Sequence, residues 1–137
     1  MNNNFLPHGD GKLPTWQLAV AATALFNTIQ NFLTLQFTKR LYNNVSPTQP
    51  VTPLQARTFG IWTLTASVVR LYAAYNIHNK AIYDMALLTY LFAFAHFSSE
   101  VLIFRSARIS IPILTPVAVA TTSLVWMILQ YDFYVKV

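Results

Sequence analysis

The feature that most constrains this chain is an apolar run from Leu13 to Thr38 that contains no charged residue. A transmembrane helix needs about 20 mostly apolar residues, because the hydrocarbon core of a bilayer is about 30 Å thick. This run is long enough to cross it. Since Pro14 stands near the start of the run, where proline is favoured in the first helical turn, we expect a membrane-spanning helix over residues 14–38.

Three further segments are long and apolar enough to span a bilayer. The second opens with Thr52 and Pro53, a capping residue followed by a first-turn proline. In the fourth, Thr115 and Pro116 form a similar pair, which predicts that this helix starts at residue 116. The expected helices therefore cover residues 53–77, 81–104 and 116–134.

The composition indicates a chain surrounded mainly by lipid. Charged residues make up 9% and apolar residues 55% of the 137 residues, whereas a soluble domain carries about 25% charged residues. We expect an all-α, polytopic membrane protein, an antiparallel bundle of four transmembrane helices over residues 13–137, with a flexible N-terminal tail over residues 1–12. The basic residues are scattered rather than gathered in a stripe, so no nucleic-acid partner is expected.

The positions of lysine and arginine predict the orientation of the bundle, because cytosolic connections are enriched in these residues. Five lie in or near the first and third connections: Lys39, Arg40, Arg57, Arg105 and Arg108. The opposite side carries three: Lys12, Lys80 and Lys136. We therefore expect both termini to lie on the lumenal side of the membrane.

Small and polar residues form a stripe on the first three predicted helices, while in the fourth they are divided between two sides, and such stripes join helices in lipid. The candidate residues of this polar seam are Asn27, Arg57, Arg70, Asp84, His96 and Glu100. A lone charge in hydrocarbon costs about 2.5 kcal/mol or more, so the charged members need partners. Measured along helices that turn near Asn79, Arg57 is level with Glu100 and Arg70 is within reach of Asp84. We predict these two ion pairs; in the alternative, Arg57 and Glu100 are solvated separately among the headgroups.

The sequence offers little for catalysis. His96 and Glu100 stand four residues apart, a spacing that can present two metal ligands on one helical face, but the other histidines, His8 and His78, lie outside the spans. We therefore expect no metal and a hydrogen-bonded His96. With no cysteine and three glycines, the chain has neither thiolate chemistry nor a glycine-rich nucleotide motif. No catalytic residue and no cofactor are predicted.

Two motifs in this sequence resemble the ergosterol biosynthetic protein 28 family. One is the run A-R-T-F-G-x-W-T from Ala56 to Thr63, and the other is H-F-x-S-E-x-x-I-F-R from His96 to Arg105. The resemblance extends from about Leu13 to Tyr134 and is strongest to fungal members. It implies a non-catalytic, multi-pass protein of the endoplasmic reticulum membrane that tethers the sterol C4-demethylation enzymes of ergosterol biosynthesis.

The partners that the resemblance implies are the C4-methyl sterol oxidase, the sterol C3 dehydrogenase/C4 decarboxylase and the 3-keto sterol reductase. The family is also linked to the C24-sterol methyltransferase. Candidate partner-binding residues are Trp62, Arg57, Arg105 and Trp126, because tryptophan and arginine are favoured anchors of interfaces. The alternative for each is an anchor at the membrane interface or a topology charge. Membrane lipid is a further partner, and the sequence leaves open a homo-oligomer.

Two other functions stay open at this stage. A sterol- or lipid-binding carrier needs an apolar cavity between the helices, and a small membrane enzyme subunit would convert the sterol itself.

Overall fold

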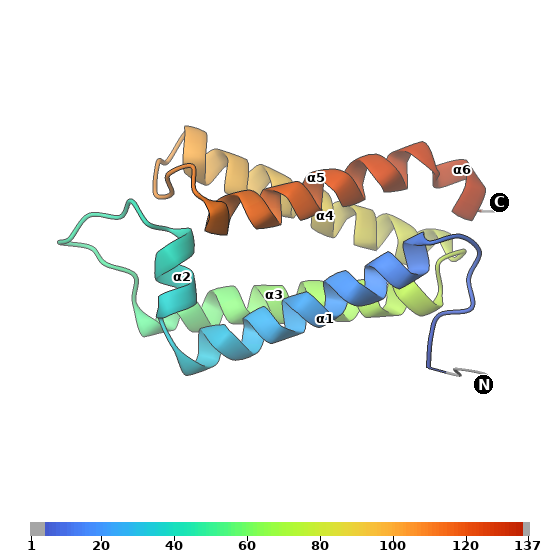
Figure 1. Cartoon of the computed structure of the whole chain (residues 1–137), viewed down its shortest axis with the longest axis horizontal. Helices are drawn as coiled ribbons and strands as arrows, with labels where there is room; N and C mark the ends of the chain where they lie inside the picture. Colours follow the sequence, from blue (N-terminus) through green and yellow to red (C-terminus); the bar gives the residue numbers. More distant parts are fainter. Residues whose placement is uncertain (1–4, 136–137) are drawn as a thin grey trace.

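The structure is a computed structural model that describes residues 5–135, and all regular structure within them is helical. Four long helices alternate in direction (Figure 1): α1 (Leu13–Leu33), α3 (Pro53–Tyr75), α4 (Lys80–Leu102) and α5 (Ile111–Leu129). Two short helices, α2 (Gln36–Leu41) and α6 (Tyr131–Tyr134), follow α1 and α5. The prediction of an all-α fold is confirmed for the part of the chain that the structure describes.

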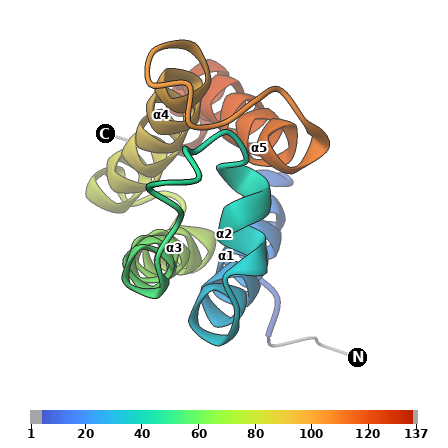
Figure 2. The ribbon, with the colours of Figure 1, turned by 90° about the vertical axis from the view of Figure 1, so that its left-hand side faces the viewer.

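The long helices form two antiparallel pairs, α1 with α3 and α4 with α5, and α2 stands across one end of the bundle (Figures 1 and 2). The α1–α3 pair is close because Gly60 has no side chain: a Cβ there would lie 2.9 Å from the Phe32 ring. Two hydroxyl contacts join the same helices, one between Thr28 and Thr63 at 2.8 Å and one from Ser67 to the carbonyl of Ala21 at 2.7 Å. Small and polar residues therefore do connect these helices.

The prediction of one helix over residues 14–38 is wrong, because α1 ends at Leu33 and Thr34 is extended. The Thr34 hydroxyl accepts a hydrogen bond from the backbone N–H of Gln36 at 3.2 Å, and this local bond starts α2 in a new direction. From α2, the Thr38 hydroxyl then donates to Oδ1 of Asn31 at 2.7 Å, which holds α2 against the end of α1. Threonine side chains thus end one helix and fix the next.

The other helix boundaries follow their capping residues. Thr52 and Gln55 form the reciprocal capping box that the sequence predicts, with N···O distances of 3.2 and 2.9 Å, and α3 starts at Pro53. The expected start of the last helix at residue 116 is wrong, since α5 begins at Ile111 and Pro116 lies inside it. Pro116 is the sixth residue of α5 and so lies beyond the first turn, where N–H groups have no helical partner; its ring removes the bond to the carbonyl of Pro112, and the helix continues past it.

Two helices among the described residues, α4 and α5, are long and apolar enough to cross a membrane. Only 22% of the most apolar window of each is buried within the protein, which leaves most of its apolar surface facing outward. The core helix of a soluble protein would be mostly buried. Outward-facing apolar helices of this length are typical of a membrane protein.

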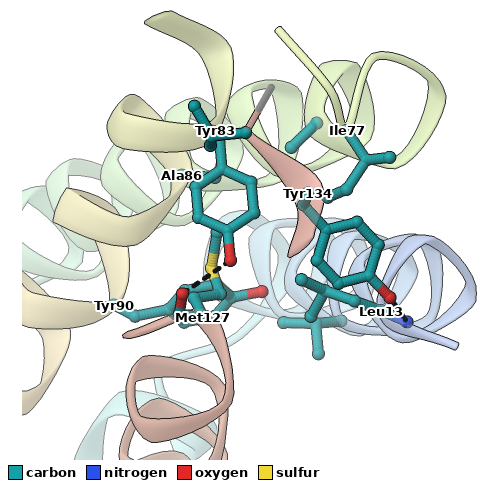
Figure 3. Packing of buried hydrophobic residues seen from close by; sticks show 10 residues of the cluster. Leu13, Ile77, Tyr83, Ala86, Tyr90, Met127 and Tyr134 are labelled. Atoms are coloured by element: carbon teal, nitrogen blue, oxygen red, sulfur yellow. Dashed lines mark hydrogen bonds between the residues drawn. The ribbon is translucent and has the colours of Figure 1, made fainter. Parts of the chain in front are cut away.

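A buried cluster closes the end of the bundle where the described chain starts and stops (Figure 3). The Tyr83 hydroxyl donates to the carbonyl of Met127 at 2.6 Å, and the N–H of Leu13 donates to the Tyr134 hydroxyl at 3.3 Å. The second bond joins the start of α1 to α6. The start of α1 and the last helix, α6, are thereby held at the same end of the bundle.

Candidate functional site

A cavity of about 270 Å³ lies between the two helix pairs. Most of its wall is apolar and comes from α1, α2, α3, α4 and α5, with aromatic rings such as Phe37 and Phe97 among the lining side chains. Thr23 on α1 and Thr115 on α5 line the cavity and are also exposed at the surface. The cavity therefore opens outward between α1 and α5, the faces that would meet lipid in a membrane.

Arg70 is the one charged residue in the wall of this cavity. Thr63, Ala66 and Arg70 all line the cavity. They are three and four residues apart on α3, so they lie on one face of that helix. Nε of Arg70 donates to the Thr89 hydroxyl at 3.1 Å, and the guanidinium carbon lies 4.2 Å from the centre of the Tyr90 ring. Both partners are on α4, so Arg70 connects the two helix pairs.

The predicted pair of Arg70 with Asp84 is wrong. Asp84 accepts from Lys80 at 2.6 Å and from the Tyr131 hydroxyl at 2.7 Å. Lys80 stands one turn before Asp84 on the same helix, a favourable spacing for an ion pair, and Tyr131 comes from the neighbouring α6. The carboxylate is satisfied by these nearer groups.

The predicted pair of Arg57 with Glu100 does not form either: among residues 5–135, no ion pair includes Arg57, which is exposed. Glu100 accepts a hydrogen bond from the Ser106 hydroxyl, and one of its oxygens lies 3.9 Å from Nδ1 of His96. The chain after α4 bends back and brings Ser106 to the carboxylate. The prediction rested on the position of each residue along its helix, which puts Arg57 and Glu100 at the same end of the bundle. It did not take into account the loop after α4, which brings Ser106 to Glu100.

A second hollow, of about 710 Å³, lies beside the first and is bordered by α3, α4 and the segment that follows α2. Phe59 and Trp62 line both spaces and so stand between them. His96 faces this hollow, and its Nε2 lies 2.6 Å from the Tyr42 hydroxyl. Burial, followed by the charge of Glu100, raises the pKa of Tyr42 above its ordinary value, so this residue stays a neutral hydroxyl.

Sequence reasoning did not single out Tyr42 as the partner of His96, because the two residues are 54 positions apart and Tyr42 follows a helix break that was not expected. Within residues 5–135, no group of three or more histidine, cysteine or acidic residues is placed to hold a metal ion. What the geometry of His96 and Glu100 can do is hold α4 against the segments around Tyr42 and Ser106.

The candidate partner-binding residues lie in different places. Trp62 is half-buried between the two hollows, with its ring 5.2 Å from the His96 ring. Trp126 packs on Trp16 with ring centres 6.1 Å apart, and its indole N–H donates to Gln130 at 2.6 Å. Arg57 lies in the first turns of α3 and Arg105 just after α4, and both are exposed; these helix ends lie at the end of the bundle where α2 stands (Figure 1). Of the four, these two arginines are the most available to another protein.

This end of the molecule, which we call the basic end, is defined by five exposed cations: Lys39, Arg40, Arg57, Arg105 and Arg108. Its two loops are joined by hydrogen bonds. The Asn44 amide donates to the carbonyl of Arg105 at 2.7 Å and its oxygen accepts from Nε of Arg108 at 2.8 Å, while Asn43 accepts from the backbone N–H of Arg108 at 2.8 Å. These bonds fix the loop that carries Arg105 and Arg108 against the segment after α2.

Comparison with known proteins decides the family. Residues 13–125 match the family model described as Erg28 like protein. The chain belongs to the ergosterol biosynthetic protein 28 family. No solved structure gives a significant match.

Relatives of this family are spread across fungi and animals. Ergosterol biosynthetic protein 28 of Candida albicans is 44% identical over 97% of this chain and 96% of its own length, and that of Schizosaccharomyces pombe is 45% identical over 86% and 85%. The human protein named ergosterol biosynthetic protein 28 homolog is 42% identical over 85% of this chain and 82% of its own. The family resemblance seen in the sequence is confirmed.

Proposed function

We propose that this protein is a non-catalytic, multi-pass scaffold of the endoplasmic reticulum membrane that tethers the sterol C4-demethylation enzymes. The observation that carries this proposal is the match of nearly the whole chain to relatives named for ergosterol biosynthesis. The proposed partners are the C4-methyl sterol oxidase, the C3 dehydrogenase and C4 decarboxylase, the 3-keto sterol reductase and the C24-sterol methyltransferase. Holding these enzymes together raises their effective concentration for one another without any catalytic group of its own.

The proposal includes membrane crossing by all four long helices. Each of them has 19 to 23 residues, which at about 1.5 Å per residue gives a length of roughly 30 Å. Lipid also requires that polar groups be satisfied within the helix. Five exposed threonines of these helices meet that requirement, because each hydroxyl donates to the carbonyl four residues earlier: Thr23, Thr58, Thr65, Thr115 and Thr121.

The basic end is the proposed docking surface on the cytosolic side. Positive residues mark the cytosolic side of membrane proteins, and both ends of the described chain are at the opposite end of the bundle. Charged rims steer and orient partners more than they add affinity. Arg57 and Arg105 are therefore expected to fix how an enzyme docks, while outward apolar helix faces supply contact area within the membrane.

Affinity purification from a mild detergent tests the proposal. We expect the tagged protein to co-purify with the oxidase and the decarboxylase, and the pair R57Q/R105Q to reduce that recovery several-fold. The matched control is K12Q, which removes an exposed charge at the opposite end of the bundle. Conversion of a C4-methyl sterol by the purified protein alone would refute the non-catalytic role. Failure of the intact protein to recover either enzyme would refute the tethering.

Sidedness has a separate test. A protease added outside sealed microsomes should leave a terminal tag intact if both termini are lumenal, and cleavage of the tag would overturn that part of the proposal.

A further inference from the structure

The least explained group in this molecule is the positive charge of Arg70. Its exposed fraction is 8%, and it lies in the wall of a mostly apolar cavity. None of the ion pairs among residues 5–135 includes it. Burying a cation costs free energy unless a negative group compensates the charge. The charge of Arg70 therefore needs a negative partner, which none of these ion pairs supplies.

The acids that topology brings nearest to Arg70 are engaged elsewhere. Asp84 is held by Lys80 and Tyr131, and Glu100 is held by Ser106 and lies beside His96. The stacking of the guanidinium on Tyr90 orients the cation without neutralising it. Within residues 5–135, none of the ion pairs supplies Arg70 with a negative partner, which leaves that role to a ligand in the cavity.

The hydrogen-bonding capacity of Arg70 specifies what that group is. A guanidinium has five N–H donors, and Nε is the one that bonds to Thr89. The two terminal nitrogens remain, and they form the fork that matches the two oxygens of a carboxylate. The cavity wall contains no other charged side chain, so one negative charge balances the site.

The remaining wall specifies the rest of the ligand. Rings and aliphatic side chains from five helices surround the space, and Asn27 adds a polar group on α1. A volume of about 270 Å³ is near the lower limit for small-molecule sites, which span roughly 300–1,000 Å³. It holds the part of a ligand next to the carboxylate, and the opening between Thr23 and Thr115 lets the rest of an apolar body extend toward lipid.

We propose that the cavity between the two helix pairs binds an amphiphile whose apolar body ends in a single carboxylate, and that Arg70 is the residue that recognises this carboxylate. Long-chain fatty acids and sterols carrying a carboxylate share this chemistry. The inference goes beyond the proposed function, because tethering enzymes requires no ligand cavity. Its failure would leave the co-purification test unaffected.

The first experiment uses the intact protein in lipid nanodiscs and no variant. Binding of oleate and of a sterol carboxylic acid is measured, each against its own methyl ester, which keeps the apolar body and removes the charge. We expect at least one acid to bind saturably and at least tenfold more tightly than its ester. The acid that shows the larger preference identifies the source of the ligand. Equal binding of acid and ester, or no saturable binding of either acid, would overturn the proposal.

The second experiment locates the site. R70Q keeps a donor for Thr89 but removes the charge, and we expect it to lose the preference for acid over ester. K12Q, an exposed change at the end of the bundle, should retain it. A brominated fatty acid should quench the fluorescence of Trp62, which lines the cavity, and the quenching should disappear in W62F. Retention of the full acid preference by R70Q, or unchanged quenching in W62F, would place the ligand elsewhere.

Discussion

The bond between Gln17 and Tyr90 offers the sharpest test of how the two helix pairs are held together. Gln17 on α1 is fully buried, and its Oε1 accepts from the Tyr90 hydroxyl of α4 at 2.6 Å. Its amide nitrogen lies 3.2 Å from the sulfur of Met127 on α5. A double-mutant cycle with Q17L, Y90F and Q17L/Y90F removes these groups singly and together.

The expected size of the effect follows from what each variant leaves behind. Q17L takes from the buried Tyr90 hydroxyl its Gln17 acceptor, and Y90F leaves the Gln17 oxygen without that donor, so each single change should cost about 1–3 kcal/mol. The double variant removes both members of the pair. It should therefore cost less than the sum, with a coupling energy of about 0.5–1.5 kcal/mol.

Thermal unfolding in a mild detergent measures the cycle. For a chain of this size, 1 kcal/mol corresponds to roughly 4 °C in Tm, so the coupling should be resolved. Y72F is the matched control, because Tyr72 is 60% exposed and its loss should leave Tm nearly unchanged. If the two single shifts simply add in the double variant, the bond does not join the helix pairs and the reasoning fails.

Three further predictions concern separate parts of the bundle. G60L should lower the free energy of unfolding by about 1–3 kcal/mol, because a leucine side chain has no room between α1 and α3. G60A should cost less, since the exposed Phe32 ring can move aside. Equal Tm values for G60L and the parent protein would contradict the prediction. Burial and the charge of Glu100 raise the pKa of Tyr42 above its ordinary value of 10.0, so stability should fall as pH rises above about 10. Urea unfolding at a series of pH values should show a shallower fall of stability in Y42F than in the parent protein. The same dependence of stability on pH in both would contradict the prediction. N44A removes the side-chain bonds to Arg105 and Arg108, so it should speed amide hydrogen exchange in residues 103–110 and lower the free energy of unfolding by about 1 kcal/mol. T48A, a change in the same exposed loop, is its control. Unchanged exchange in N44A would show that other contacts hold the loops.

Local chemistry made much of the architecture predictable. The Thr52–Gln55 capping box fixes the start of α3 within a few residues of sequence, so it can be read without knowing the fold. The small and polar face of α3 is equally local, since Gly60, Ser67 and Arg70 recur at helical spacing, and all three are buried. Such patterns depend only on backbone geometry and helical periodicity.

The break after Leu33 shows where local reasoning stops. Apolar residues continue past this point, and hydropathy alone extends the helix to Thr38. Instead, the bond from Thr38 to Asn31 requires that the chain first turn at Thr34, so the turn and the contact stabilise each other. The candidate site was affected in the same way, since His96 was identified from its helix but its partner Tyr42 comes from beyond this turn.

The sequence by itself determined that the described chain is helical, where α3 and α4 begin, and which family it belongs to, because these depend on short-range hydrogen bonds, periodic burial and motif order. Only the tertiary structure decided that Asp84 accepts from the distant Tyr131 hydroxyl, that Arg70 faces a cavity and stacks on Tyr90, and that the loops of the basic end are joined. Each of these depends on distances between helices that are far apart in sequence. Side-chain contacts across such distances are set by how the two helix pairs pack, which no local pattern contains.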